Sequence, residues 1–134
     1  MTAHTLNPYP KVVTDASPIA AAKLSQQGLE QLAGGEAAEA AGSFRSAIAA
    51  DPDCFEAHHG LIRALRDAGR LEQSVAAALA LTALTPNDPL AHTALSISLQ
   101  HAGHVPEAEA AAARARVLEW KAELQSSVPE DPTP

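Results

Sequence analysis

Two stretches of this chain, AHHGLIRALRDAG at residues 57–69 and AHTALSISLQHAG at residues 91–103, carry matching residue types 34 positions apart. The same interval separates Pro52 from Pro86. A fixed period of this length is typical of repeat architectures. The recurring pairs are Ala57 and Ala91, His58 and His92, Leu61 and Leu95, and Leu65 and Leu99. We therefore divide most of the chain into three units, 21–54, 55–88 and 89–122.

Each unit carries the signals of two helices joined by a turn. A glycine (Gly35, Gly69 or Gly103) lies between two apolar segments, where a residue in the left-handed conformation ends one helix. The chain has 31 alanines, and only 3% of its residues are aromatic, which favours thin helices that pack closely. Strand-forming residues never alternate with polar ones over a run. The sequence therefore predicts an all-α fold, a solenoid of helical hairpins.

The cap residues set the expected helix boundaries. Ser17 and Asp88 each stand directly before a proline, the arrangement of an N-cap with proline in the first turn. Asp53 is followed three residues later by Glu56, which predicts a capping box. Short connections predict antiparallel neighbours. The expected helices are 18–33, 37–50, 54–68, 71–84, 89–102 and 106–124.

The helical domain is expected over residues 18–124, between two segments of different composition. Residues 1–17 hold prolines that a helix interior does not tolerate, so we expect an extended arm. Residues 125–134 are acidic and proline-rich, which predicts disorder. The first residues lack the pattern of a secretory signal, and Cys54 is the only cysteine, so we expect a cytoplasmic protein.

Apolar and small residues recur at fixed places within the units. They include Gly28, Ala40, Phe44 and Pro52 in the first unit, Leu61, Leu65, Ser74 and Pro86 in the second, and Leu95, Leu99, Ala108 and Ala115 in the third. This pattern resembles the tetratricopeptide repeat (TPR), W-x2-L-G-x2-Y, then A-x3-F, then P, within 34 residues. The chain is similar to short stand-alone bacterial TPR proteins with three repeats. His58 and His92 stand in an aromatic place of the pattern, and we expect them to fill that slot between helices.

The resemblance implies a short right-handed superhelix whose first helices line a concave groove, where the family holds peptides of other proteins. Aligning the units predicts the partner-binding residues of this groove: Leu29, Leu32, Glu56, His59, Arg63, Arg66, Thr93, Ile97, Gln100 and His101. Ser25 aligns with His59 and Thr93, and Leu90 aligns with Glu56, so we expect both on the same face. The resemblance thus makes another protein or peptide the expected partner.

Two arginines give the middle of the groove a basic character. Arg63 and Arg66 are three residues apart, so both guanidinium groups can reach one carboxylate-bearing segment of a partner. The alternative is that they form weak surface pairs with Asp67 or Glu56. The formal net charge of −7 excludes a nucleic-acid binder that relies on phosphate contacts.

A second candidate surface lies on the last helix. Ala113, Val117, Trp120 and Leu124 follow one another at spacings of three and four, which predicts an apolar stripe. Val117 or Leu118 is expected to turn inward, and the outer part of the stripe to meet a partner or a second copy of the chain.

The sequence offers no candidate for catalysis, a cofactor or a metal. It has no nucleophile elbow, phosphate loop or metalloprotease helix, and no set of Cys and His with zinc-ligand spacing. No apolar run reaches the ~18 residues that cross a bilayer, so no membrane insertion is expected. The predicted function is an adaptor that binds through the groove. The alternatives are an accessory subunit or homo-oligomer docked through the last helix, and an assembly or secretion chaperone.

Overall fold

The structure, a computed structural model, describes residues 16–127 of the chain. The expected arm (1–17) and tail (125–134) lie outside this range except for residues 16–17 and 125–127. The described part has no strand and consists of six helices: α1 (Pro18–Ala33), α2 (Ala37–Ala50), α3 (Phe55–Asp67), α4 (Leu71–Leu84), α5 (Pro89–His101) and α6 (Val105–Ser127). The all-α prediction is confirmed.

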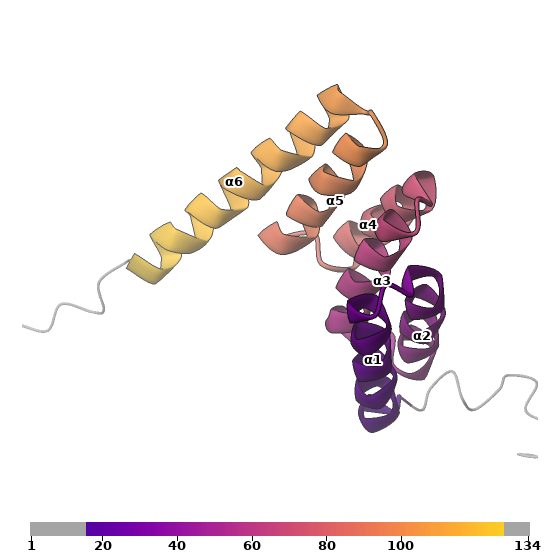
Figure 1. The fold of residues 1–134 in the computed structure, drawn as a ribbon. Coiled ribbons are helices and arrows are strands. Elements are labelled where there is room, and N and C mark those ends of the chain that lie inside the picture. Colours follow the sequence, from indigo (N-terminus) through magenta and orange to yellow (C-terminus); the bar gives the residue numbers. More distant parts are fainter. Residues whose placement is uncertain (1–15, 128–134) are drawn as a thin grey trace, which may run out of the picture.

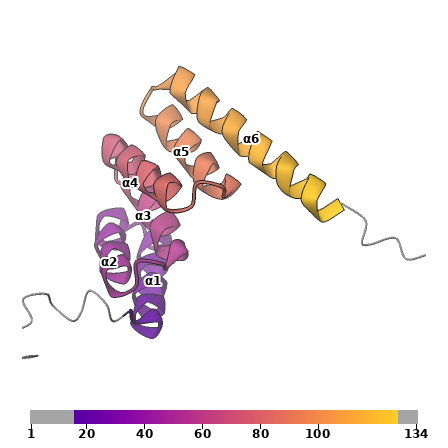
Figure 2. The same ribbon diagram turned by 180° about the vertical axis from the view of Figure 1, so that it is seen from behind.

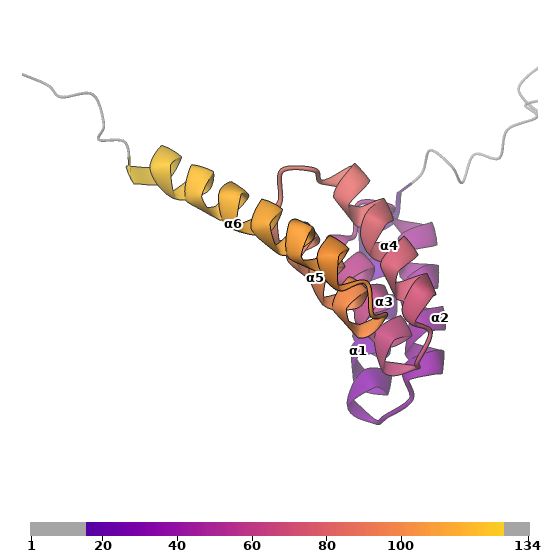
Figure 3. The ribbon, with the colours of Figure 1, turned by 90° about the horizontal axis from the view of Figure 1, so that it is seen from above.

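The helices form three hairpins, α1–α2, α3–α4 and α5–α6, called the first, second and third hairpin below (Figure 1). Each helix packs against the next one in the chain, and α3 also packs against both α1 and α5. The first helices of the hairpins therefore lie side by side, as the view from above shows (Figure 3). This arrangement is the helical-hairpin solenoid that the repeat predicts.

The turns inside the hairpins follow the glycine signal. Gly35, Gly69 and Gly103 have φ angles of 79°, 78° and 86°, a left-handed conformation that glycine adopts without a Cβ clash. One residue later, the Arg70 N–H donates to the Leu65 carbonyl at 2.9 Å. This bond satisfies a carbonyl that the end of the helix would leave unpaired.

The predicted N-caps are confirmed at two helices and wrong at a third. The Ser17 hydroxyl accepts from the Ala20 N–H at 3.4 Å, and Asp88 accepts from the Leu90 N–H at 3.0 Å. No capping box forms at Asp53, because α3 begins one residue later than expected and its N-cap is Cys54. The Asp53 N–H instead donates to the Asp51 carboxylate at 3.1 Å.

Helix α6 extends past the end that we predicted at Leu124. It continues to Ser127, so residues 125–127 are helical rather than disordered. The second half of α6 projects beyond α5 (Figures 1 and 2), and residues 119–127 are all exposed.

One aromatic ring organises the core of the first two hairpins. Phe44 on α2 is fully buried among alanines and Leu65. Gly28 on α1 and Gly60 on α3 both lie against its ring, and a Cβ added to Gly28 would come within 2.7 Å of the Phe44 Cζ. The two glycines therefore provide the space that this ring occupies.

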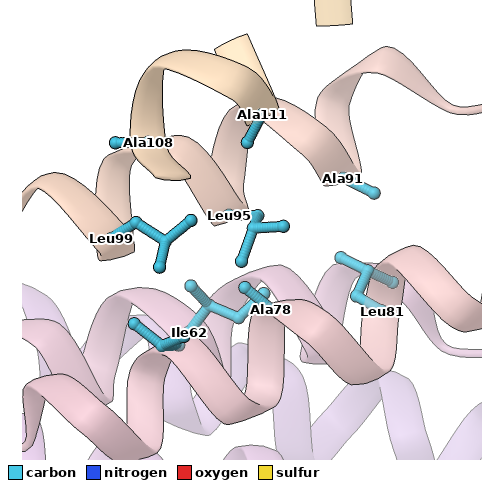
Figure 4. Close-up of a cluster of buried hydrophobic side chains, with 9 residues drawn as sticks. Ile62, Ala78, Leu81, Ala91, Leu95, Leu99, Ala108 and Ala111 are labelled. Carbon is cyan, nitrogen blue, oxygen red and sulfur yellow. The ribbon is translucent and has the colours of Figure 1, made fainter. Parts of the chain in front are cut away.

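The second and third hairpins share a core of aliphatic side chains (Figure 4). Ile62 and Leu81 come from the second hairpin, and Leu95 and Leu99 from the third. A polar contact crosses the same interface. The Ser74 hydroxyl donates to the Ile62 carbonyl at 2.9 Å and lies 2.7 Å from the buried hydroxyl of Ser98. Hydrogen bonding offsets the cost of burying these two hydroxyl groups.

The outward faces of the first and third hairpins carry polar residues where the second hairpin carries apolar ones. Leu61 packs on the core of the first two hairpins, whereas its equivalent in the first hairpin is the exposed Gln27. Val75 packs against the third hairpin, and its equivalent there is the exposed Glu109. Both ends of the described stack therefore carry an exposed polar side chain at the place where the second hairpin carries an apolar one.

Candidate functional site

A hollow of about 290 Å³ opens between α3 and α5. Its lining combines apolar side chains with three nitrogen-bearing ones: His59, Ile62, Arg63, Arg66, Leu90, Thr93, Ala94 and Ile97. The predicted groove residues His59, Arg63, Arg66, Thr93 and Ile97 all belong to this set. The structure thus brings the middle of the predicted groove together as one concave site.

Other predicted groove residues lie outside the hollow. Leu29 and Glu56 are exposed away from its lining. Leu32 packs on the core of the first two hairpins. Gln100 lines a different hollow at the outward face of the third hairpin, and the exposed His101 ring bonds to the Ile97 carbonyl.

Ser25 is not on the groove surface as predicted. Its side chain is fully buried, and its hydroxyl lies 3.5 Å from the Cys54 sulfur. The physical reason is the small size of Ala21, Ser25 and Gly28, which are all buried in α1. Small side chains let two helices approach closely and leave no room for a hollow between them.

The alignment missed two residues of the lining, Ile62 and Ala94. The Ile62 side chain is almost fully buried and also lines the hollow. Leu90 is 64% exposed, a large value for a leucine. The signal that could have found the hollow is the size of His59 and Ile62, which stand where the first hairpin has Ser25 and Gly28.

The two arginines differ in their surroundings. The Arg63 Nε lies 3.6 Å from the Asp67 carboxylate, and both side chains are exposed, so this pair contributes little to stability. Arg66 is half-buried, and no carboxylate lies within 4 Å of its guanidinium group among residues 16–127. Among residues 16–127, the surface pair of the alternative is therefore present at Arg63 and absent at Arg66.

His59 lies at the edge of the hollow beside the start of α5. Burial lowers the pKa of His59 below its usual value, because the charged form loses hydration. The carboxylate of Asp88 acts in the opposite direction, and the neighbouring His58 lowers the pKa further. At pH 7 the site therefore holds a neutral imidazole next to two permanent positive charges.

The lowered pKa of His59 predicts a pH dependence of stability. In the unfolded chain this histidine has a pKa of about 6.5, which is higher than its pKa in the folded protein. The contribution of His59 to stability is therefore fully present above about pH 6.5. The stabilisation is lost as the pH falls through the folded-state pKa. Melting temperatures at pH 7.5, 6.5 and 5.5 should fall more steeply for the wild type than for His59→Gln. Parallel curves for the two proteins would assign the pH effect to other groups.

Comparisons with known proteins agree with this geometry. Residues 31–98 match the family described as Tetratricopeptide repeat. This chain belongs to that family. Among solved structures, a chain of the CopN-Scc3 complex superposes with a TM-score of 0.67 at 19% identity, covering 95% of this TPR chain and 85% of that chain. This likeness confirms the solenoid fold. No curated protein sequence matches.

The histidines in the aromatic place of the TPR pattern act differently from what we expected. The His58 Nε2 lies 2.8 Å from the Pro52 carbonyl, and the His92 Nε2 lies 2.8 Å from the Pro86 carbonyl. Each half-buried ring therefore fastens the turn before its own helix, provided that Nε2 carries the proton. Within residues 16–127 no group of three His, Cys, Asp or Glu side chains is placed to hold a metal ion.

The predicted apolar stripe of α6 is exposed. Leu118 is buried as expected, whereas Val117 is 41% exposed, because consecutive residues of a helix point about 100° apart. Trp120 is 60% exposed and Leu124 is 47% exposed. Between residues 16 and 127, no helix is long and apolar enough to cross a membrane.

Proposed function

We propose that this TPR protein is an interaction module that binds a segment of another protein in the hollow between α3 and α5. Family membership supports the general role, since solenoids of this kind present a concave surface to their partners. The observation that carries the proposal is the open apolar hollow beside Arg66, whose charge has no acidic partner in the described part of the chain. The three-repeat count agrees with the three hairpins.

The exposed stripe of α6 supports a second candidate, docking of the protein into a larger assembly through Val117, Trp120 and Leu124. Exposed apolar patches on a protein surface commonly mark sites of contact with other proteins. We rank it below the hollow because the stripe is a narrow strip on one helix, and a separate hollow beside this helix is lined by Asn87, Leu118, Lys121, Ala122 and Gln125 instead. The chaperone role, a homo-oligomer, a cytoplasmic location and the lack of catalysis, cofactor and metal stay predictions.

Two substitutions separate the candidates. Ile97→Asp puts a charge into the hollow, and Trp120→Glu puts one into the stripe of α6. With the purified full chain as bait in a lysate of its host, we expect Ile97→Asp to lose at least about 90% of the captured partner, since burying an unpaired charge costs several kcal/mol. Trp120→Glu should capture it as the wild type does.

Circular dichroism of both variants provides the control for folding. The opposite pattern, with capture lost only in Trp120→Glu, would move the binding surface to α6. Equal capture by the wild type and both variants would contradict both candidates.

A further inference from the structure

We propose that the segment bound between α3 and α5 is acidic as well as apolar: one aliphatic side chain enters the hollow, and a neighbouring Asp or Glu of the same segment meets Arg66. This inference rests on the proposed function, and it names the chemistry of the partner at that site.

The hollow has room for an aliphatic side chain. Its volume of about 290 Å³ lies just below that of pockets that bind whole ligands, which run from ~300 to 1,000 Å³. Its apolar lining comes from Ile62, Leu90, Ala94 and Ile97. Leu90 and Ile97 are 64% and 37% exposed, so an aliphatic side chain placed on them removes apolar surface from water on both sides of the contact.

The charges around the hollow favour a carboxylate. Arg63 and Arg66 stand on the α3 side, within one turn of each other, while Leu90 and Ile97 belong to α5. A guanidinium group binds a carboxylate through two parallel hydrogen bonds, and the half-buried position of Arg66 reduces screening by water. A carboxylate from the partner would therefore reach α3 while the aliphatic side chain rests on α5.

The acidic residues nearby do not favour a basic partner instead. Asp88 caps α5 through the Leu90 N–H, and Asp67 pairs with Arg63. Neither residue lines the hollow, and neither does Glu56. Because the Arg63–Asp67 pair is exposed and weak, a partner carboxylate can also replace Asp67 at Arg63.

The test is selection from a displayed library of random twelve-residue peptides on the purified full chain. We expect the enriched peptides to combine Leu, Ile, Val or Met with Asp or Glu within a few positions. A labelled enriched peptide, measured by fluorescence polarisation, should bind Arg66→Gln about tenfold more weakly, because a charge-assisted hydrogen bond is lost. Arg45→Gln on α2 removes the same charge outside the hollow and should leave the affinity unchanged.

The outcomes separate this inference from the proposed function. Enriched peptides without acidic residues that still lose binding to Ile97→Asp would overturn the acidic partner and leave the hollow as the binding site. Peptides that bind Ile97→Asp as well as the wild type would overturn both. If peptides are enriched on Trp120→Glu but not on the wild type, α6 of a second copy occupies the hollow, and this result would overturn the inference. A selection that enriches no peptide on either protein would overturn it too.

Discussion

Replacing Phe44 by alanine is expected to lower the free energy of unfolding by about 3–5 kcal/mol, the usual cost of removing a buried aromatic side chain. Phe44 is fully buried, and it is the largest side chain in the core of the first two hairpins. The buried residues around it are alanines and Leu65, with glycines at positions 28 and 60, so small side chains leave much of the cavity unfilled. Urea unfolding followed by circular dichroism measures the loss.

The chain supplies a matched control for this substitution. Phe55, at the start of α3, is 43% exposed and belongs to neither core cluster. Phe55→Ala should therefore cost about 1 kcal/mol or less, because much of its surface is already in water. Equal losses for the two variants would contradict the role assigned to the Phe44 ring.

Gly60→Ala is the second substitution for which we expect a large effect, and its direction is opposite to helix propensity. Alanine in place of glycine inside a helix usually stabilises by about 1 kcal/mol. At Gly60 the new methyl group would overlap the Phe44 ring, which is itself enclosed by α1, α2 and α3. We expect a net loss of about 1–3 kcal/mol, the range measured for overpacked cores.

Gly42→Ala tests the same chemical change without the clash. Nothing lies within 4 Å of a Cβ added at Gly42, and the residue is exposed on α2. Urea unfolding should show this variant to be more stable by about 1 kcal/mol. The double variant Gly60→Ala with Phe44→Leu should lose less than the sum of its two single changes, since the smaller side chain relieves the overlap. Strict additivity would argue against direct contact between residues 44 and 60.

The fold was predictable because glycine and proline mark its turns. Gly35, Gly69 and Gly103 adopt the left-handed conformation that their spacing indicated, and the six helices lie close to their expected ranges. The end of α6 was less predictable. Our domain boundary followed the change in composition after Leu124, whereas the helix continues to Ser127.

The candidate site was predictable where neighbouring hairpins are alike and unpredictable where they differ. Alignment of repeats placed His59, Arg63, Arg66, Thr93 and Ile97 correctly around one hollow. It failed at Ser25. Equivalent positions lie at the same point along their helices, but the distance between neighbouring first helices differs from one pair of hairpins to the next. That spacing depends on the size of the side chains that meet, such as Ser25 in one hairpin and His59 in the next. An alignment shows which positions correspond, but it does not show how far apart the neighbouring helices lie.

The polar outward faces of the stack set a limit on growth. Units that stack through like faces can add to one another without end, as monomers add to a fibre, unless the last face is made unattractive. Another hairpin placed against Glu109 would cover a carboxylate in the place where the second hairpin offers Val75. One placed against Gln27 would cover an amide where Leu61 stands in the second hairpin. At each of these two places an added hairpin would have to desolvate a polar group, and this cost disfavours end-to-end growth of the stack.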